Sequence, residues 1–120
     1  MESLGKVISI EAGEDLSSST EKVVTLNSSG KAIGFSAITN IPAGILKNAP
    51  VTGEAAEIAI DGVSRIWLGG TLSPGALVGA SAAGKAVADA STNYNIGVLL
   101  KGGADGEIGE VILGSKTATA

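Results

Sequence analysis

The chain has 120 residues, a net charge of −4, and neither histidine nor cysteine, so its composition predicts one small acidic domain. The missing cysteine excludes a disulfide framework and a thiolate metal site, and the missing histidine removes the commonest general base and zinc ligand. The eight lysines and arginines are scattered singly, without the basic stripe that neutralises phosphates, and we therefore expect no nucleic-acid partner.

Short strands separated by glycine-containing turns account for the first half of the sequence. Apolar and polar residues alternate over several segments, which is the pattern of a half-buried strand. The predicted strands are Val7–Glu11, Glu21–Leu26, Ala32–Ala37, Ala55–Ile60 and Val63–Leu68. Asn27–Lys31 predicts a hairpin turn in which Gly30 has a positive φ, and Asp61-Gly62 predicts a two-residue hairpin between the last two strands.

The second half repeats this rhythm around a second hairpin tip at Gly84. Its predicted strands are Ala76–Gly79, Ala86–Ala88, Asn95–Leu100 and Glu110–Leu113. The Ala-rich stretch from Ala76 to Ala90 is the one candidate for a helical turn or two, although its glycines oppose a long helix. Frequent turns with short alternating strands between them predict an all-β fold, a small barrel or sandwich with at most a short helical segment.

Spacing within the two halves indicates an internal duplication. The Gly-Lys-Ala turn at Gly30 recurs 54 positions later at Gly84. Three further features recur 53 positions later: Gly44 as Gly97, Gly53 as Gly106, and Glu57 as Glu110. We therefore divide the chain into an N-terminal arm (1–14), a single β domain (15–114) with pseudo-repeated halves (about 16–60 and 72–113), and a flexible tail (115–120).

The apolar residues of the chain are mostly small. Hydrophobic residues make up 44% of the sequence but aromatic ones only 2%, so the core must consist of Val, Ile, Leu and Ala. Eighteen glycines raise the entropic cost of folding. Burial against further copies of the chain, or against a partner, is therefore expected. No signal peptide is visible and no apolar run is long enough for a bilayer, so we expect no membrane partner.

Carboxylate pairs are the remaining candidates for chemistry. Glu54 and Glu57, and likewise Glu107 and Glu110, stand three apart at the start of a predicted strand. Positions three apart on a strand face opposite sides, so neither pair can readily close on one substrate. The simpler interpretation is that Glu54 and Glu107 shape turns while the other two face solvent. We expect no catalytic, cofactor-binding or metal-binding residues.

Trp67 is the main candidate for an interface. In the strand around it, Arg65 and Trp67 share one face while Ile66 and Leu68 share the other. If Ile66 and Leu68 face the core, Trp67 lies outside and is suited to anchor a partner; if the strand is inverted, Trp67 is the one large ring of the core. The candidate partner-interface residues are Val7, Ile8, Ile10 and Trp67.

From Ile8 to Gly114 the sequence resembles the bacteriophage capsid cement, or head decoration, proteins. The resemblance lies in the order of the Gly-Lys-Ala turns, Gly44, the Asn95–Val98 stretch, the Gly70–Gly75 loop and the Gly-Glu that leads into Glu110–Leu113. It implies a compact β barrel, usually trimeric, bound outside an icosahedral head at three-fold positions. The Ser17–Thr20 loop and the Ala-rich stretch depart from this pattern.

The resemblance implies a structural virion protein that stabilises the expanded head from the capsid exterior, after synthesis in the host cytoplasm. Its partners would be the major capsid protein and itself, as a homotrimer, with no cofactor, nucleic acid or membrane. One alternative is another virion component, a tail or fibre subunit. A non-viral β binding module without catalysis is a further alternative, and an enzyme is the weakest class.

Overall fold

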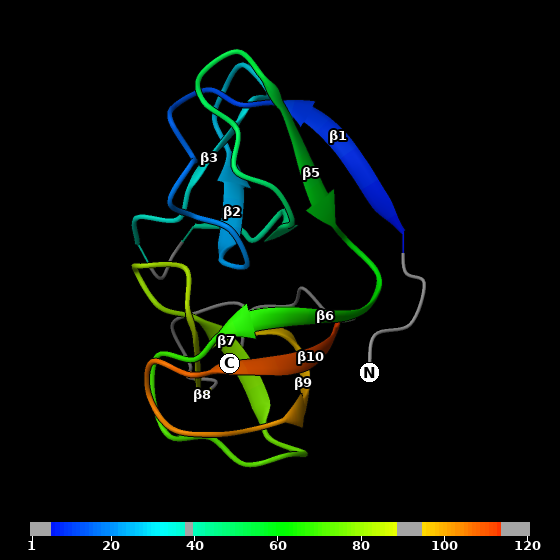
Figure 1. Cartoon of the computed structure of the whole chain (residues 1–120), viewed down its shortest axis with the longest axis vertical. Coiled ribbons are helices and arrows are strands. Elements are labelled where there is room, and N and C mark those ends of the chain that lie inside the picture. The colour runs from blue at the N-terminus through cyan, green and yellow to red at the C-terminus, as the bar shows by residue number, and fades with distance from the viewer. Residues whose placement is uncertain (1–5, 38–39, 89–94, 114–120) are drawn as a thin grey trace.

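The computed structural model describes residues 6–37, 40–88 and 95–113, whose regular structure consists of β-strands alone (Figure 1). The strands are β1 (Val7–Glu11), β2 (Val23–Leu26), β3 (Ala32–Gly34), β4 (Gly44–Leu46), β5 (Ala55–Ala59), β6 (Gly62–Trp67), β7 (Leu77–Ala80), β8 (Ala86–Ala88), β9 (Asn95–Lys101) and β10 (Ile108–Leu113). The predicted all-β class is therefore confirmed. The expected tail at 115–120 lies outside the described residues.

The strands form two antiparallel five-stranded sheets with the same topology. The first sheet has the order β1-β5-β4-β2-β3 and the second the order β6-β10-β9-β7-β8. Each strand of the second sheet therefore has the same position in its sheet as the strand numbered five lower has in the first. We call the two sheets with their turns the first unit and the second unit. They stack along the long axis of the molecule, with β6 at the boundary between them (Figure 1).

Hydrogen bonds repeat between the units residue by residue. The N–H of Gly30 donates to the carbonyl of Asn27 at 3.0 Å, and that of Gly84 donates to Ser81 at 2.9 Å. Both glycines have a positive φ, 78° and 79°, as predicted for the two hairpin tips. The Asn27 side chain and the Ser81 hydroxyl each accept two backbone N–H groups of their own turn. The chain therefore contains one small β unit twice.

Each sheet curls until its two edge strands meet. In the first unit a parallel bridge joins Ala12, just beyond β1, to Ala32 of β3, and the N–H of Gly13 donates to the Ala32 carbonyl at 2.7 Å. In the second unit the same bridge joins Leu68 to Ala86, with Gly69 as the donor at 2.7 Å. Closure of this kind leaves only part of each edge available for pairing.

Two apolar clusters form the core. The smaller fills the interior of the first unit with residues such as Leu16, Leu46 and Ile58. The larger fills the second unit and also includes four residues of the first: Val23, Phe35, Ile45 and Ala59. Because neighbouring residues on β2 and β4 enter different clusters, these strands are buried on both faces. The outer face of the first unit thus packs against the second.

The predicted hairpin at Asp61-Gly62 is wrong. Gly62 has the positive φ (79°) that the turn signal implies, but β5 pairs with β1 and β4 whereas β6 pairs with β10. The turn instead carries the chain from one unit to the next. In the Ala-rich stretch, β7 and β8 form a hairpin, and residues 76–88 contain no helix.

Gly44 of β4 and Gly97 of β9 are equivalent positions of the two units, and we expect both to be essential for strand packing. An added Cβ would clash with the Ala59 carbonyl oxygen at Gly44, and with the Ile112 carbonyl oxygen at Gly97. Either Gly→Ala change should therefore lower the free energy of unfolding by about 1–3 kcal/mol or more, measured by urea denaturation. Gly70→Ala, which meets nothing within 4 Å, is the control and should change little. Equal effects at Gly70 and Gly44 would contradict this packing.

Candidate functional site

The junction between the units is built on the outward edge of β6. The carbonyl of Glu21 accepts the backbone N–H of Trp67 at 3.0 Å, and the N–H of Val23 donates to the carbonyl of Gly84 at 2.8 Å. The segment Glu21–Val23 therefore lies between β6 and the β7–β8 turn. A Cβ at Gly84 would stand 2.7 Å from the Val23 carbonyl oxygen, so only glycine allows this approach.

Glu21 combines a strained backbone with the charge network of the junction. Its φ is 65°, a left-handed conformation that is unfavourable for a residue with a side chain. Its carboxylate is 3.6 Å from both the Lys47 ammonium and the Arg65 guanidinium, and the side chain is only 15% exposed. Lys47 also donates to the Ser64 hydroxyl at 3.0 Å, which links β4 to β6. The strain at Glu21 thus accompanies contacts that join the units.

The second unit has glycine where the first has Glu21. Gly75 has a φ of 86°, and its N–H donates to Leu99 at 2.7 Å just as that of Glu21 donates to Leu46. The backbone conformation is therefore a property of the duplicated unit. The carboxylate belongs to the first unit alone, where it meets the second.

The position of Trp67 lies between the two alternatives left by the sequence, an exposed anchor and a ring in the core. Ile66 and Leu68 are completely buried, which puts Trp67 on the outer face of β6. The ring is nevertheless partly buried, because its indole Nε1–H donates to the carbonyl of Thr20 at 3.2 Å. Trp67 therefore anchors an interface within the chain, between the two units. Its role toward another protein stays a prediction.

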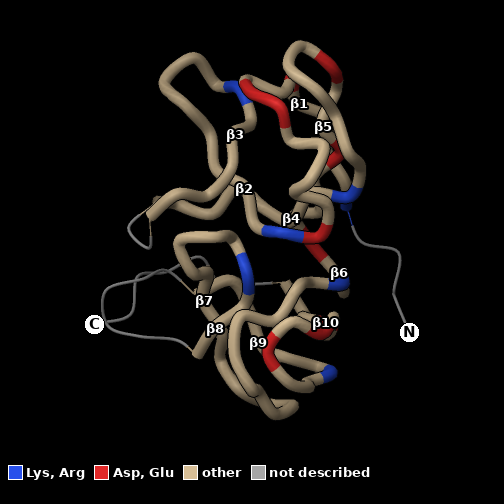
Figure 2. The backbone as a smooth tube through the Cα atoms, turned by 60° about the vertical axis from the view of Figure 1, so that its left-hand side comes forward, with Lys and Arg blue, Asp and Glu red and all other residues tan. Residues whose placement is uncertain are grey.

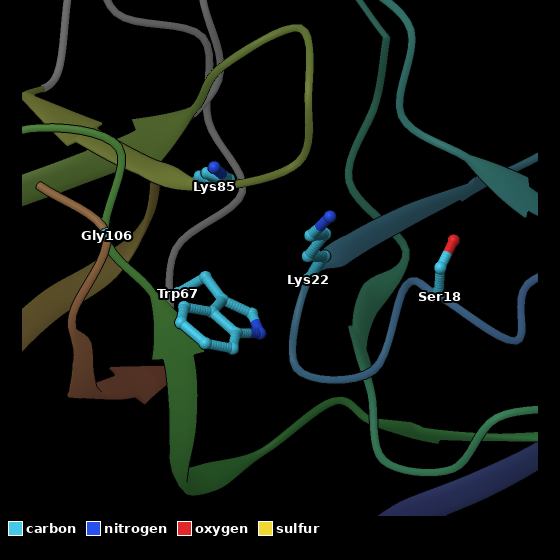
Figure 3. Close-up of a pocket in the computed structure, with 5 residues that line it drawn as sticks. All are labelled: Ser18, Lys22, Trp67, Lys85 and Gly106. Carbon is cyan, nitrogen blue, oxygen red and sulfur yellow. The ribbon is translucent and has the colours of Figure 1, made fainter.

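A hollow of about 240 Å³ lies beside this ring, lined by Ser18, Lys22, Trp67, Lys85 and Gly106 (Figure 3). Lys22 and Lys85 reach it from different units and flank the indole. Two ammonium groups can attract a carboxylate and the indole ring offers an apolar contact, but the lining provides neither a general base nor a metal ligand set. The hollow therefore has the chemistry of a contact surface.

The carboxylates singled out by sequence have structural roles. Glu54 accepts the N–H of Val51 at 2.9 Å, and Glu107 accepts that of Ala104 at 2.7 Å, which confirms that both shape turns. Glu57 accepts a hydrogen bond from the Ser9 hydroxyl at 3.0 Å.

Asp15 has a lowered pKa. Hydrogen bonds from the Ser17 hydroxyl and backbone N–H hold the pKa of Asp15 below its usual value of 3.8, so this exposed carboxylate is a weakened base.

The predicted interface residues Val7, Ile8 and Ile10 lie on β1, the edge strand of the first sheet. Ile8 and Ile10 pack against the core of the first unit, and Val7 is 49% exposed. Ala12 donates to Glu54, and Ile60 to Lys6, so even-numbered residues bond to β5. The N–H and C=O groups of Val7 and Ser9 therefore point away from β5.

Charges of both signs are interspersed over the described backbone, and they alternate where β4 approaches β6 (Figure 2). Within the described ranges, no group of three or more acidic, His or Cys side chains could hold a metal ion. No helix there is long and apolar enough to cross a membrane.

Two closed five-stranded β units, packed edge to face, define the class of fold. No family model matches the sequence, and no curated protein matches it. The structure is similar to the crystal structure of the head fiber gp8.5 N base in bacteriophage phi29, with a TM-score of 0.69. The two sequences are 13% identical, and the match covers 93% of this chain and 97% of that one. This likeness establishes a shared fold.

Two variants of Glu21 should separate the cost of its left-handed backbone from the stabilisation by its two ion pairs. Glu21→Ala keeps the left-handed backbone and loses both ion pairs, whereas Glu21→Gly loses the ion pairs but also relieves the strain. We expect the Gly variant to lie between wild type and the Ala variant, about 1 kcal/mol above the latter in urea unfolding. An Ala variant as stable as the Gly variant would contradict the strained conformation.

Trp67 should contribute to stability through both its ring and its N–H. Trp67→Phe keeps most of the packing but loses the donor to Thr20, and should cost about 1 kcal/mol of unfolding free energy. Trp67→Ala also loses the packing and should cost about 2–4 kcal/mol. Thermal unfolding of both variants tests this, and an unchanged Trp67→Ala variant would show that the ring does not support the junction.

Proposed function

We propose that this chain is a structural protein of a phage virion, which binds the outer surface of the capsid and stabilises the expanded head. The observation that carries the proposal is the fold shared over 93% of the chain with a protein described as a phage head fiber base. The sequence rhythm that resembles capsid cement proteins supports the same position. The turn-shaping roles of Glu54 and Glu107 favour a protein without catalysis.

Stabilisation by such a protein follows from linkage. A protein that binds the assembled shell and not its separated subunits adds its binding free energy to the assembled state. Because the chain carries a net charge of −4, attraction to packaged DNA does not drive this binding. Empty expanded shells should therefore bind as well as full ones.

The outward edge of β1 is our candidate for the shell contact. In the second unit the equivalent edge, β6, is occupied by the segment Glu21–Val23 of the same chain. In the first unit, β1 presents the backbone groups of Val7 and Ser9 at the end of the sheet order. An extended segment of another protein can add to such an edge by strand pairing. The second unit thus shows that another segment of chain can bond to this edge, there through the Trp67 N–H.

A second candidate is the attachment base of a head fibre, and the description of the similar structure favours it. Both candidates bind the outside of a head. They differ in consequence, because cement raises the resistance of the head to heat, whereas a base that only anchors a fibre leaves it unchanged. Thermal disruption of expanded heads, with and without the protein, separates them.

Head binding should depend on the backbone N–H of Ser9. Ser9→Pro removes that N–H, which points away from β5, and proline is tolerated on edge strands. Ser9→Ala is the matched control, because it loses the same hydroxyl but keeps the N–H. We expect the Pro variant to remain folded and lose at least tenfold in affinity for expanded heads, formed from the major capsid protein encoded with this chain, in a cosedimentation assay.

Two outcomes of this assay would contradict the proposals. If Ser9→Pro binds heads as tightly as Ser9→Ala, β1 is not the shell contact. If the unaltered protein binds neither full nor empty heads, the capsid proposal itself is wrong.

A further inference from the structure

One row of apolar residues is buried in the first unit and exposed in the second. In the first unit, Val23 of β2 is in register with Ile45 of β4, which is in register with Ala59 of β5. These residues are 1%, 0% and 5% exposed because the second unit covers them. They form the face through which one β unit of this fold already packs on another.

The second unit carries the same row, and no described part of the chain covers it. Leu77 of β7 is in register with Val98 of β9, which is in register with Ile112 of β10. The three side chains are 45%, 40% and 43% exposed. A bulge in β9 adds Leu100, which is 45% exposed. We call Leu77, Val98, Leu100 and Ile112 the aliphatic row.

The chemistry of the aliphatic row suits contact with itself. All four members are aliphatic, so two such rows can meet without taking a charge out of water. The carboxylate that Glu21 provides beside the covered row is also missing, since Gly75 occupies that position. What remains is a surface that gains from losing water and needs no charged partner.

A head-to-tail arrangement between copies is less favourable. It would put the aliphatic row of one copy on the first unit of the next, between β1 and the β2–β3 turn. There Lys31 and Glu11 form an ion pair at 3.4 Å, whereas the second unit has Trp67 in place of Glu11. An aliphatic cover would desolvate both charges without offering them a partner.

We propose that the aliphatic row is the contact between copies of this chain, which meet row against row about a symmetry axis. A closed symmetric contact of this type uses the same patch on every copy. It lies in the second unit, so it leaves β1 of the first unit available for another partner. The contact belongs to the isolated protein, and its failure would leave the proposed capsid binding untouched.

A charge in the aliphatic row should dissociate the oligomer. We expect light scattering of the unaltered protein at about 100 μM to give a multiple of the 11.7 kDa chain mass. Val98→Glu should reduce the mass to that of one chain. Val51→Glu is the matched control, since Val51 is 46% exposed and lies in the first unit, and it should leave the mass unchanged.

A single introduced cysteine tests which surfaces meet. The chain has no cysteine of its own, so any disulfide in Val98→Cys must join two copies at that residue. Such a bond requires Cα atoms within about 7 Å. We expect Val98→Cys, a small change that preserves folding, to become mostly disulfide-linked under mild oxidation, and Val51→Cys to stay mostly unlinked.

Three results would overturn the proposal. The first is a monomeric unaltered protein at about 100 μM, and the second is a Val98→Glu variant that keeps the oligomeric mass. The third is dissociation by Val98→Glu without linkage of Val98→Cys, which would mean that the aliphatic row meets a different surface of the neighbouring copy.

Discussion

The outward edge of β6 is where two separate β units become one structure. Backbone groups at a sheet edge must find partners when another element covers them. Here the Glu21 carbonyl and the Val23 N–H supply those partners, to Trp67 and Gly84 respectively. The same short segment brings Val23 into the larger core cluster. Hydrogen bonding and apolar burial therefore join the units at one place and fix how they pack on each other.

The two units share one topology, but their side chains differ where the units pack on each other. Glu21 in one corresponds to Gly75 in the other, and Glu11 at the end of β1 corresponds to Trp67 at the end of β6. Each difference lies at or next to a surface that one unit covers and the other leaves open. The surfaces that remain open, the β1 edge and the aliphatic row, are copies of surfaces that the chain itself uses inside the junction. The proposed functions of this protein lie on these copies.

Local patterns in the sequence predicted the elements well and the relations between them less well. Gly30 and Gly84 marked both hairpins because a positive φ is a local requirement that glycine meets. Asp61-Gly62 produced an equally strong local signal, yet the pairing of β5 and β6 depends on competing strands far away in the sequence. The equal spacing of glycines and glutamates predicted the duplication, since each of these glycines marks a turn or a close approach that both units need.

The candidate site was harder to predict than the fold. The sequence left Trp67 open between an exposed partner anchor and a core ring, and its acceptor, the Thr20 carbonyl, is a backbone atom that no sequence pattern reveals. Glu21 was predicted to be the first residue of a strand, whereas β2 begins at Val23 and Glu21 is left-handed. Comparison with Gly75, at the same point of the second unit, could have shown it, because a glycine there implies a left-handed backbone. An internal repeat thus carries information about strain that a single copy does not.

The two hairpin tips also differ in what they can accommodate. At Gly84 the turn is closed against Val23, whereas a side chain at Gly30 would meet nothing within 4 Å, and the neighbouring Ser28 and Ser29 are exposed. Both ends of the first turn are tied by hydrogen bonds between Asn27 and Lys31. Extra residues inserted at an exposed tip of this kind disturb a fold least. The β2–β3 hairpin is therefore the natural place to carry a foreign peptide on this scaffold, and its duplicate is not.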